Sequence, residues 1–181
     1  MKRWIRSCVF FGFLAGVGLA PFSEADAALN AYLKLKGQKQ GSIKGSVTQK
    51  GNEGAIKVLA ISHELVSPRD AATGLPTGKR QHKPLVITKE IDKSTPLLNA
   101  VLTNNENIPT WELAVNLPNG KGGEALAYTI KLTDASITSI RTVTDDDGNL
   151  LEQVSFTYKK IEWVWVNGGI TAEDDWEQPA A

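Results

Sequence analysis

Apolar and polar residues alternate in short runs along most of the chain. In the run AYLKLK (31–36), Ala31, Leu33 and Leu35 fall on one face of an extended strand, and the remaining residues fall on the other. Because successive side chains of a strand point to opposite faces, this alternation predicts half-buried β-strands. Further runs that predict strands lie at residues 55–65, 84–90, 111–117, 126–132, 135–143 and 150–166.

Two groups of turn-forming residues separate neighbouring runs. PNGKGGE (118–124) joins the runs at 111–117 and 126–132, and DDDGN (145–149) joins the last two runs. Glycine, asparagine and aspartate favour the backbone conformations of tight turns. Each of these pairs of runs is therefore predicted to form an antiparallel hairpin.

The last run contains a break in its period. Its apolar residues occupy even positions up to Tyr158 and odd positions from Ile161 onward. The facing of a strand has a period of two, so the apolar face reverses between these residues. The break predicts either a bulge at Lys159 and Lys160 or a strand that leaves one sheet for another.

One segment has the pattern of a helix. Ser94 or Thr95 can cap it, and Pro96 suits its first turn. About eight strands and this helix predict a mainly β fold, a compact β-barrel of two packed antiparallel sheets with one short α-helix. The apolar stripe of the helix consists of Leu97, Leu98, Val101 and Leu102.

The first 27 residues have the layout of a secretory signal peptide. Three basic residues precede an apolar run at residues 8–20, which is too short to span a bilayer. Small residues before position 28 predict cleavage after Ala27. We therefore predict a signal peptide at residues 1–27 and one β-barrel domain at residues 28–181, with an amphipathic or buried N-terminal helix as the alternative to the signal peptide.

Composition narrows the classes of partner for residues 28–181. They hold 17 basic and 18 acidic residues, and this balance gives no reason to expect a nucleic-acid partner. The only cysteine, Cys8, belongs to the predicted signal peptide, so the mature domain needs no disulfide. No later apolar run approaches the ~20 residues of a membrane helix, which argues against stable membrane insertion.

Few residues could carry chemistry. His63 and His82 have no cysteine or carboxylate at a metal-ligand spacing, and no nucleophile motif such as G-x-S-x-G occurs. A triad assembled from distant residues stays open as an alternative. Glu90 and Asp92 lie between lysines and are expected to form salt bridges or a turn. We predict that the protein is not an enzyme, has no catalytic, cofactor-binding or metal-binding residues, and uses no cofactor.

The DDDGN turn shares part of its pattern with a calcium-binding loop. Such a loop would require an acid or an asparagine at Val143, and its flanks would have to be helical. Neither condition is met, so a hairpin turn is the expected structure.

Residues 66–82 form a long stretch without a strand or helix pattern. Loops of this length are uncommon in small domains and are usually functional or mobile. The stretch is either a flexible excursion or an arm that orders against a neighbouring subunit. Trp111, Trp163 and Trp165 are interpreted as barrel core or, where exposed, as part of a subunit interface.

Several of these segments together resemble one known family, the haemolysin-coregulated proteins (Hcp) of type VI secretion systems. The central motif is HKPLVITKEIDKSTPLLNAVL (82–102). The other similar segments are AYLKLKGQKQGSI (31–43), IKVLAISHEL (56–65), YTIKLTDASITSI (128–140) and EQVSFTYKKIEWVW (152–165).

The resemblance implies a structural tube subunit that forms a homo-hexameric ring. Rings would stack into a hollow tube that meets a spike protein and a sheath, carries or chaperones effector proteins, and is itself secreted. Family members have no catalytic centre unless another domain is fused to them. On this view TKEIDKSTPLL (88–98) is architectural, and residues 66–82 correspond to an extended loop that touches adjacent subunits or rings.

The predicted signal peptide departs from the family pattern, because family members usually lack one. It would deliver the chain to the periplasm, so the expected localisation is secreted or extracellular, with the periplasm as an alternative. The alternative function is a periplasmic or secreted Hcp-like binding or structural protein outside a secretion tube.

Overall fold

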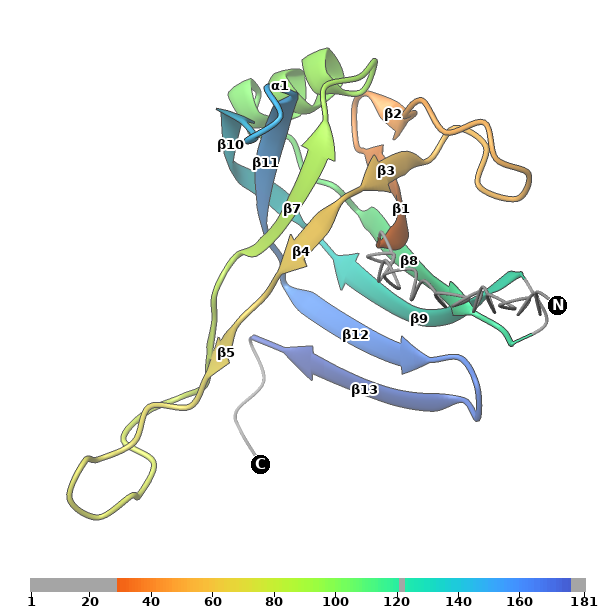
Figure 1. Cartoon of the computed structure of the whole chain (residues 1–181). Helices are drawn as coiled ribbons and strands as arrows, with labels where there is room; N and C mark the ends of the chain where they lie inside the picture. The colour runs from red at the N-terminus through yellow and green to blue at the C-terminus, as the bar shows by residue number, and fades with distance from the viewer. Residues whose placement is uncertain (1–28, 121–122, 177–181) are drawn as a thin grey trace, which may run out of the picture.

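The described part of the protein is built mainly of antiparallel strands, with one helix packed at an end (Figure 1). The computed structural model describes residues 29–120 and 123–176, and the predicted signal peptide lies outside them. In chain order the elements are β1 (Asn30–Gly37), β2 (Gly41–Ile43), β3 (Ile56–Val58), β4 (Ala60–Ser62), β5 (Leu65–Val66), β6 (Gln81–His82), β7 (Leu85–Glu90), α1 (Thr95–Thr103), β8 (Thr110–Pro118), β9 (Glu124–Thr133), β10 (Ser136–Thr144), β11 (Leu150–Thr157), β12 (Lys160–Trp165) and β13 (Ile170–Asp175).

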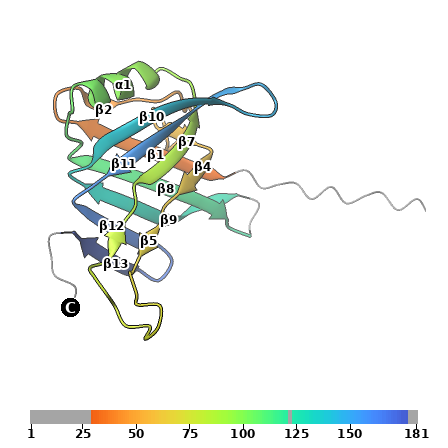
Figure 2. The same cartoon turned by 90° about the vertical axis from the view of Figure 1, so that its left-hand side faces the viewer.

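The strands form two packed sheets and a short ribbon (Figure 2). The large sheet has seven strands in the order β13-β12-β9-β8-β1-β2, with β3 also paired to β1. The small sheet has the order β10-β11-β7-β4, and β5 pairs with β6. Both predicted hairpins are present, as β8–β9 and β10–β11. The mainly β fold of packed antiparallel sheets with one helix is therefore confirmed.

Within the described residues the chain passes between the sheets at four places: at Leu59, through α1 between β7 and β8, at residues 134–135 between β9 and β10, and at residues 158–159. β11 ends at Thr157 in the small sheet and β12 begins at Lys160 in the large sheet, which confirms a change of sheet where the apolar face reverses. The crossing at Leu59 lies between β3 in the large sheet and β4 in the small one. The expectation of one strand at residues 55–65 is wrong for that reason, because the run is divided into β3, β4 and β5.

The two sheets do not close into a barrel within the part of the chain that the structure describes. β13 is an outer strand of the large sheet, and β10 and β4 are the outer strands of the small sheet. A closed barrel has no such edges. The expected barrel is corrected to an open sandwich whose sheets are joined by the chain at these crossings.

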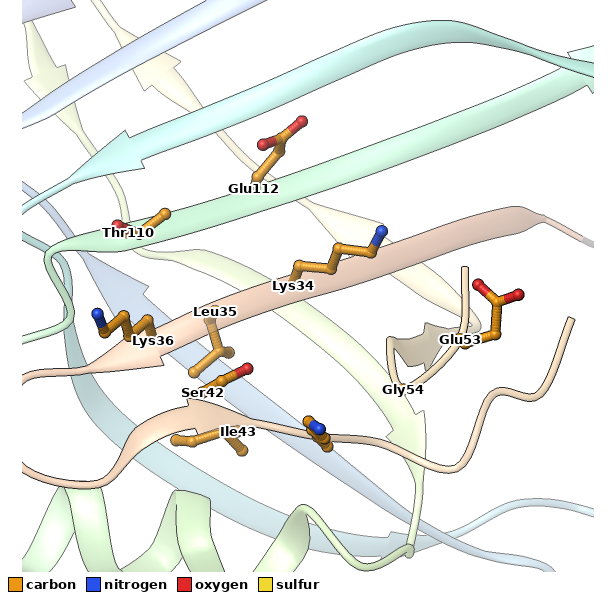
Figure 3. A pocket seen from close by; sticks show the side chains of 10 residues that line it. Lys34, Leu35, Lys36, Ser42, Ile43, Glu53, Gly54, Thr110 and Glu112 are labelled. Atoms are coloured by element: carbon orange, nitrogen blue, oxygen red, sulfur yellow. The ribbon is translucent and has the colours of Figure 1, made fainter. Parts of the chain in front are cut away.

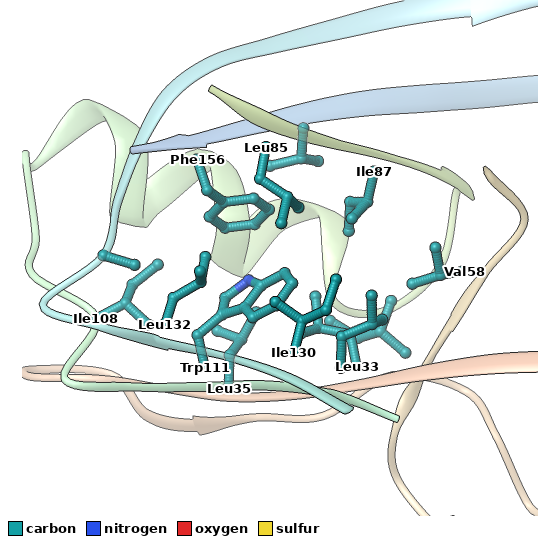
Figure 4. Close-up of a cluster of buried hydrophobic side chains, with 14 of the residues drawn as sticks. Leu33, Leu35, Val58, Leu85, Ile87, Ile108, Trp111, Ile130, Leu132 and Phe156 are labelled. Atoms are coloured by element: carbon teal, nitrogen blue, oxygen red, sulfur yellow. The ribbon is translucent and has the colours of Figure 1, made fainter. Parts of the chain in front are cut away.

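The hydrophobic core lies between the inner faces of the sheets (Figure 4). Trp111 of β8 meets Phe156 of β11 with ring centroids 5.5 Å apart and an interplanar angle of 63°. An aromatic contact of this geometry adds roughly 0.5–1.5 kcal/mol beyond the burial of its area. The contact ties the centres of the two sheets together. The residues around it include Leu33, Leu35, Val58, Leu85, Ile87, Ile108, Ile130 and Leu132.

The helix is where the sequence placed it, but its details differ. Ser94 occupies the N-cap position, yet its hydroxyl donates to Asp92 instead of capping the helix. Of the expected apolar stripe, Leu98 and Val101 are fully buried, whereas Leu97 is 38% exposed. No helix within the described ranges is long and apolar enough to cross a bilayer.

A buried ion pair lies beneath the start of the helix. Lys89 of β7 stands opposite Glu152 of β11, with Nζ and Oε1 2.6 Å apart and both side chains 1% exposed. Lys89 Nζ lies 3.0 Å from Asp92 Oδ1 and donates to the Thr95 hydroxyl. Thr95 in turn donates to Glu152 Oε1 at 2.8 Å. These contacts fix the strand end, the turn and the helix start to one another.

Asp92 organises the turn between β7 and α1. Its carboxylate accepts hydrogen bonds from the backbone N–H groups of Ser46 and Ser94. Burial raises the pKa of Asp92, but hydrogen bonds from Ser94 and Lys89 outweigh that effect and hold the pKa below its ordinary value. The expected salt-bridge and turn role is confirmed for Asp92.

Replacing Lys89 with alanine is expected to lower the free energy of unfolding by about 3–5 kcal/mol, because Glu152 would remain buried without its partner. Urea denaturation of residues 28–181 measures the change. The matched control is Lys93→Ala, an exposed lysine four positions along the chain, which should change stability by no more than about 0.5 kcal/mol. Equal stability of the two variants would contradict the role assigned to the ion pair.

Candidate interaction surfaces

Residues 66–82 form an arm that projects away from both sheets (Figure 1). β5 and β6 pair at its root, and an isolated bridge joins Arg69 to Pro76 farther out. At the tip, the Asp70 carboxylate accepts from the backbone N–H and the hydroxyl of Thr73. Residues 71–79 are all exposed. The arm is thus a ribbon with its own hydrogen bonds, not an irregular loop.

The root of the arm is held by a buried polar network that the sequence did not predict. Two imidazoles meet at the hydroxyl of Tyr158: His63 Nε2 lies 2.7 Å from it and His82 Nδ1 lies 2.8 Å from it. His82 Nε2 contacts Asp174 Oδ2 of β13 at 2.7 Å. Asp174 also receives two hydrogen bonds from the guanidinium of Arg80. The network joins the arm to the β11–β12 crossing and to β13.

Burial explains the electrostatics of this network. Burial and, to a smaller extent, the Asp174 charge raise the pKa of Tyr158 well above its ordinary value, so its hydroxyl keeps its proton. Burial also lowers the pKa of His63, with a further contribution from His82. Hydrogen bonds from Arg80 lower the pKa of Asp174, which outweighs the opposing effect of burial. The phenol is therefore a protonated hydrogen-bonding link between two imidazoles.

One signal in the sequence points to this network. Tyr158 continues the inward-facing positions of β11, and a buried hydroxyl almost always has a hydrogen-bond partner. The two histidines are its partners, but they come together only because the chain returns from the arm beside β5. Within the described residues, no group of three or more histidine, cysteine or acidic side chains is arranged to hold a metal ion.

The end of the large sheet carries an apolar ledge, in which Trp165 and Ile170 are exposed and Trp163 and Tyr128 are partly buried against the core. Trp165 stands opposite Tyr128 of β9 and Ile170 of β13 in the strand pairing. Exposure rises along β12, from a fully buried Ile161 to Trp165 at 41%, and Ile170 is 67% exposed. Trp111 is core as expected, whereas Trp165 belongs to a surface of the kind that proteins use for association.

The outer face of the large sheet is charged instead. A register row crosses it from Lys34 through Glu112, Lys131 and Glu162 to Glu173, with charges of both signs. One ion pair of this row, Lys131 with Glu162, has a separation of 3.5 Å and is largely exposed. The two faces of the sheet therefore differ sharply, one apolar and one solvated.

A shallow pocket of about 230 Å³ lies at the end of this charged face (Figure 3). Lys34, Lys36 and Lys44 border it, and Glu53 and Glu112 line it as well. Charges of both signs therefore meet in an open, exposed hollow. We interpret the pocket as part of the solvated face.

The DDDGN segment forms the hairpin turn that the sequence predicted. The Asp145 carboxylate accepts from the backbone N–H groups of Asp147 and Asn149 and from the side-chain amide of Asn149. These hydrogen bonds lower the pKa of Asp145. Its oxygens close the turn between β10 and β11.

Replacing Arg80 with alanine is expected to raise the pKa of Asp174 toward its ordinary value, because the largest influence that lowers it is removed. Carboxyl carbon NMR titration of Asp174 measures the shift. Arg69→Ala is the matched control, since Arg69 bonds only within the arm, to the Gly74 carbonyl at 3.1 Å. An unchanged Asp174 titration in Arg80→Ala would contradict the assigned contact.

Comparison with known proteins gives matches over most of the chain. Residues 32–165 match a family model described as type VI secretion system effector, Hcp. The major exported protein of Pseudomonas aeruginosa is 39% identical over 170 residues, covering 85% of this chain and 99% of that protein.

Solved structures with the same fold include three that are well matched in sequence. The crystal structure of an Hcp protein has a TM-score of 0.79 at 33% identity and covers 84% of this chain and all of that one. A variant of Hcp1 from E. coli EAEC 042 has a TM-score of 0.76 at 36% identity, covering 82% and 99%. Secreted protein Hcp3 from Pseudomonas aeruginosa has a TM-score of 0.70 at 34% identity, covering 83% and 100%.

Proposed function

The chain belongs to the Hcp family of type VI secretion proteins, and we propose that it is a structural tube subunit that assembles into hexameric rings. Hcp family members form such rings in the type VI secretion system. Here the rings stack into a tube that meets the spike and sheath and carries or chaperones effector proteins. The observation that carries the proposal is the match of fold and sequence to Hcp structures over nearly their whole length.

The surfaces of the single chain support assembly. A ring in which identical subunits meet head to tail needs two different surfaces on each subunit. The apolar ledge and the open edge of β13 supply one of them, because both leave groups exposed that a neighbour can cover. The charged outer face of the large sheet suits contact with water.

We also propose that the protein catalyses no reaction. The Hcp family is a family of structural tube proteins, and the polar networks described here hold the fold together. The alternative of a binding or structural protein outside a secretion tube is not favoured by the comparisons.

Ring formation is expected to depend on the apolar ledge. Ile170→Asp places a charge on a side chain that is 67% exposed, so it should change the stability of the single chain by less than about 1 kcal/mol. It should nevertheless weaken each subunit contact by at least ~1.4 kcal/mol, a tenfold loss of affinity. Light scattering after size exclusion, with negative-stain electron microscopy of residues 28–181, shows the result.

The control for this experiment is Thr171→Ala, an exposed neighbour on β13. It should give six-membered rings like the unmodified protein. If Ile170→Asp formed rings of normal abundance, the ledge would not be part of the subunit interface. An unmodified protein that stays monomeric at high concentration would contradict the tube function itself.

We expect the protein to be exported from the cell, and a relative at 39% identity is named a major exported protein. We further propose that residues 1–27 are a cleavable signal peptide, on the strength of their basic start and apolar run. Mass spectrometry of the protein recovered outside the cytoplasm should then find Ala28 at its N-terminus. Intact residues 1–27 on the exported protein would exclude the signal peptide while leaving the tube function unaffected.

A further inference from the structure

The polar network at the root of the arm has a fixed direction of hydrogen donation. Asp174 is ionised at neutral pH, so His82 must direct an N–H from Nε2 to it. With its proton on Nε2, His82 accepts through Nδ1 from the Tyr158 hydroxyl, whose pKa is too high for it to lose its proton. The Tyr158 oxygen in turn accepts from His63 Nε2. Each member thus donates to the next.

The closed network can accept one extra proton. A proton added to Nδ1 of His82 makes that atom a donor to the Tyr158 oxygen. The phenol then turns its own hydrogen toward His63, which accepts through Nε2 after moving its proton to Nδ1. Both hydrogen bonds at Tyr158 exchange donor and acceptor, the bond from His82 to Asp174 is unchanged, and every contact is kept.

A second proton is incompatible with the closed network. With both imidazoles protonated, His63 and His82 donate to the same oxygen, and the Tyr158 hydroxyl is left with no acceptor among these partners. The two cationic rings would also lie with centroids 6.5 Å apart. A buried donor without a partner and a pair of like charges both disfavour this state.

The carboxylate of the network, Asp174, contacts His82 and can offset a charge there, but its contacts in the network are with His82 and Arg80 and do not include His63. The indole of Trp163 packs near His63 and that of Trp176 near His82, so apolar rings cover both imidazoles. The other charged residues adjacent along the same segments are Glu64, Lys83, Lys159, Lys160 and Asp175.

We propose that His63, Tyr158 and His82 form a latch that holds the root of the arm to the β11–β12 crossing and opens when binding of a second proton leaves the Tyr158 hydroxyl without an acceptor. The three side chains come from the β4–β5 link, the β11–β12 crossing and β6. Opening therefore changes the attachment of the arm while the aromatic core stays packed. The latch is a property of the single chain and does not depend on ring formation.

The sign of the pH effect follows from His63. Its pKa is lowered in the closed form, first by burial and then by His82, so the closed form binds fewer protons than the open form. The penalty is absent above the ordinary histidine pKa of about 6.5 and grows as the pH falls below that value toward the lowered pKa. The arm therefore opens in mildly acidic solution.

Amide hydrogen exchange of residues 28–181 at about pH 7.5 and about pH 5, on either side of the histidine pKa, tests the latch. The reporters are the β5 and β6 amides and the Lys83 N–H, which donates to the Glu64 carbonyl at 3.0 Å. Their protection, corrected for intrinsic exchange, should fall about fivefold in acid, the factor for one hydrogen bond of average strength. Amides of β8 should keep their protection. Equal arm protection at both pH values would overturn the proposal.

Two variants separate the latch from general acid sensitivity. His63→Gln can still donate or accept at Tyr158 but cannot take up a proton, so its arm should stay protected in acid. Tyr158→Phe lacks the shared hydroxyl, so its arm should be poorly protected at both pH values. Tyr128→Phe, which alters a half-buried tyrosine on β9, is the control and should behave like the unmodified protein.

The outcome for His63→Gln is decisive even if Tyr158→Phe proves too unstable to fold. An arm that opens in acid in His63→Gln as it does in the unmodified protein would refute the latch. Repeating the exchange after dilution keeps contacts with neighbouring subunits out of the result, because the latch is concentration-independent and subunit contacts are not.

Discussion

The alternate facing of side chains along β11 is the constraint on which the rest of the structure depends. Four inward residues, Glu152, Val154, Phe156 and Tyr158, enter the interior in succession, and all are buried. The next inward apolar residue, Ile161, comes from the opposite sheet, so the chain must change sheets between Tyr158 and Ile161. The inward row is polar at both ends and apolar in the middle.

Each polar end of that row holds a different part of the molecule. Glu152 pairs with Lys89 and accepts from Thr95, which fixes the helix start. Tyr158 bonds His63 and His82, which fixes the root of the arm. Buried polar groups need hydrogen-bond partners, so one physical requirement positions both elements. The motif that first suggested a secretion-tube protein is architectural in this literal sense.

Local patterns in the sequence predicted the strands, the hairpins and the helix, because facing and turn chemistry depend on near neighbours. The break in period after Tyr158 predicted one change of sheet. A similar but shorter break, with Ile56 and Val58 at even positions and Ile61 at an odd one, marked the crossing at Leu59 and was not recognised. The sequence could not show that the sheets stay open or that the two histidines meet, since both features depend on contacts between distant segments.

β11 carries Glu152, and Tyr158 directly follows it. The register of β11 against β7 therefore determines the positions of both the helix start and the root of the arm. A slip by one residue would turn Glu152 and Tyr158 to the outer side together. An error in this alignment would therefore displace the helix and the arm together, never one of them alone.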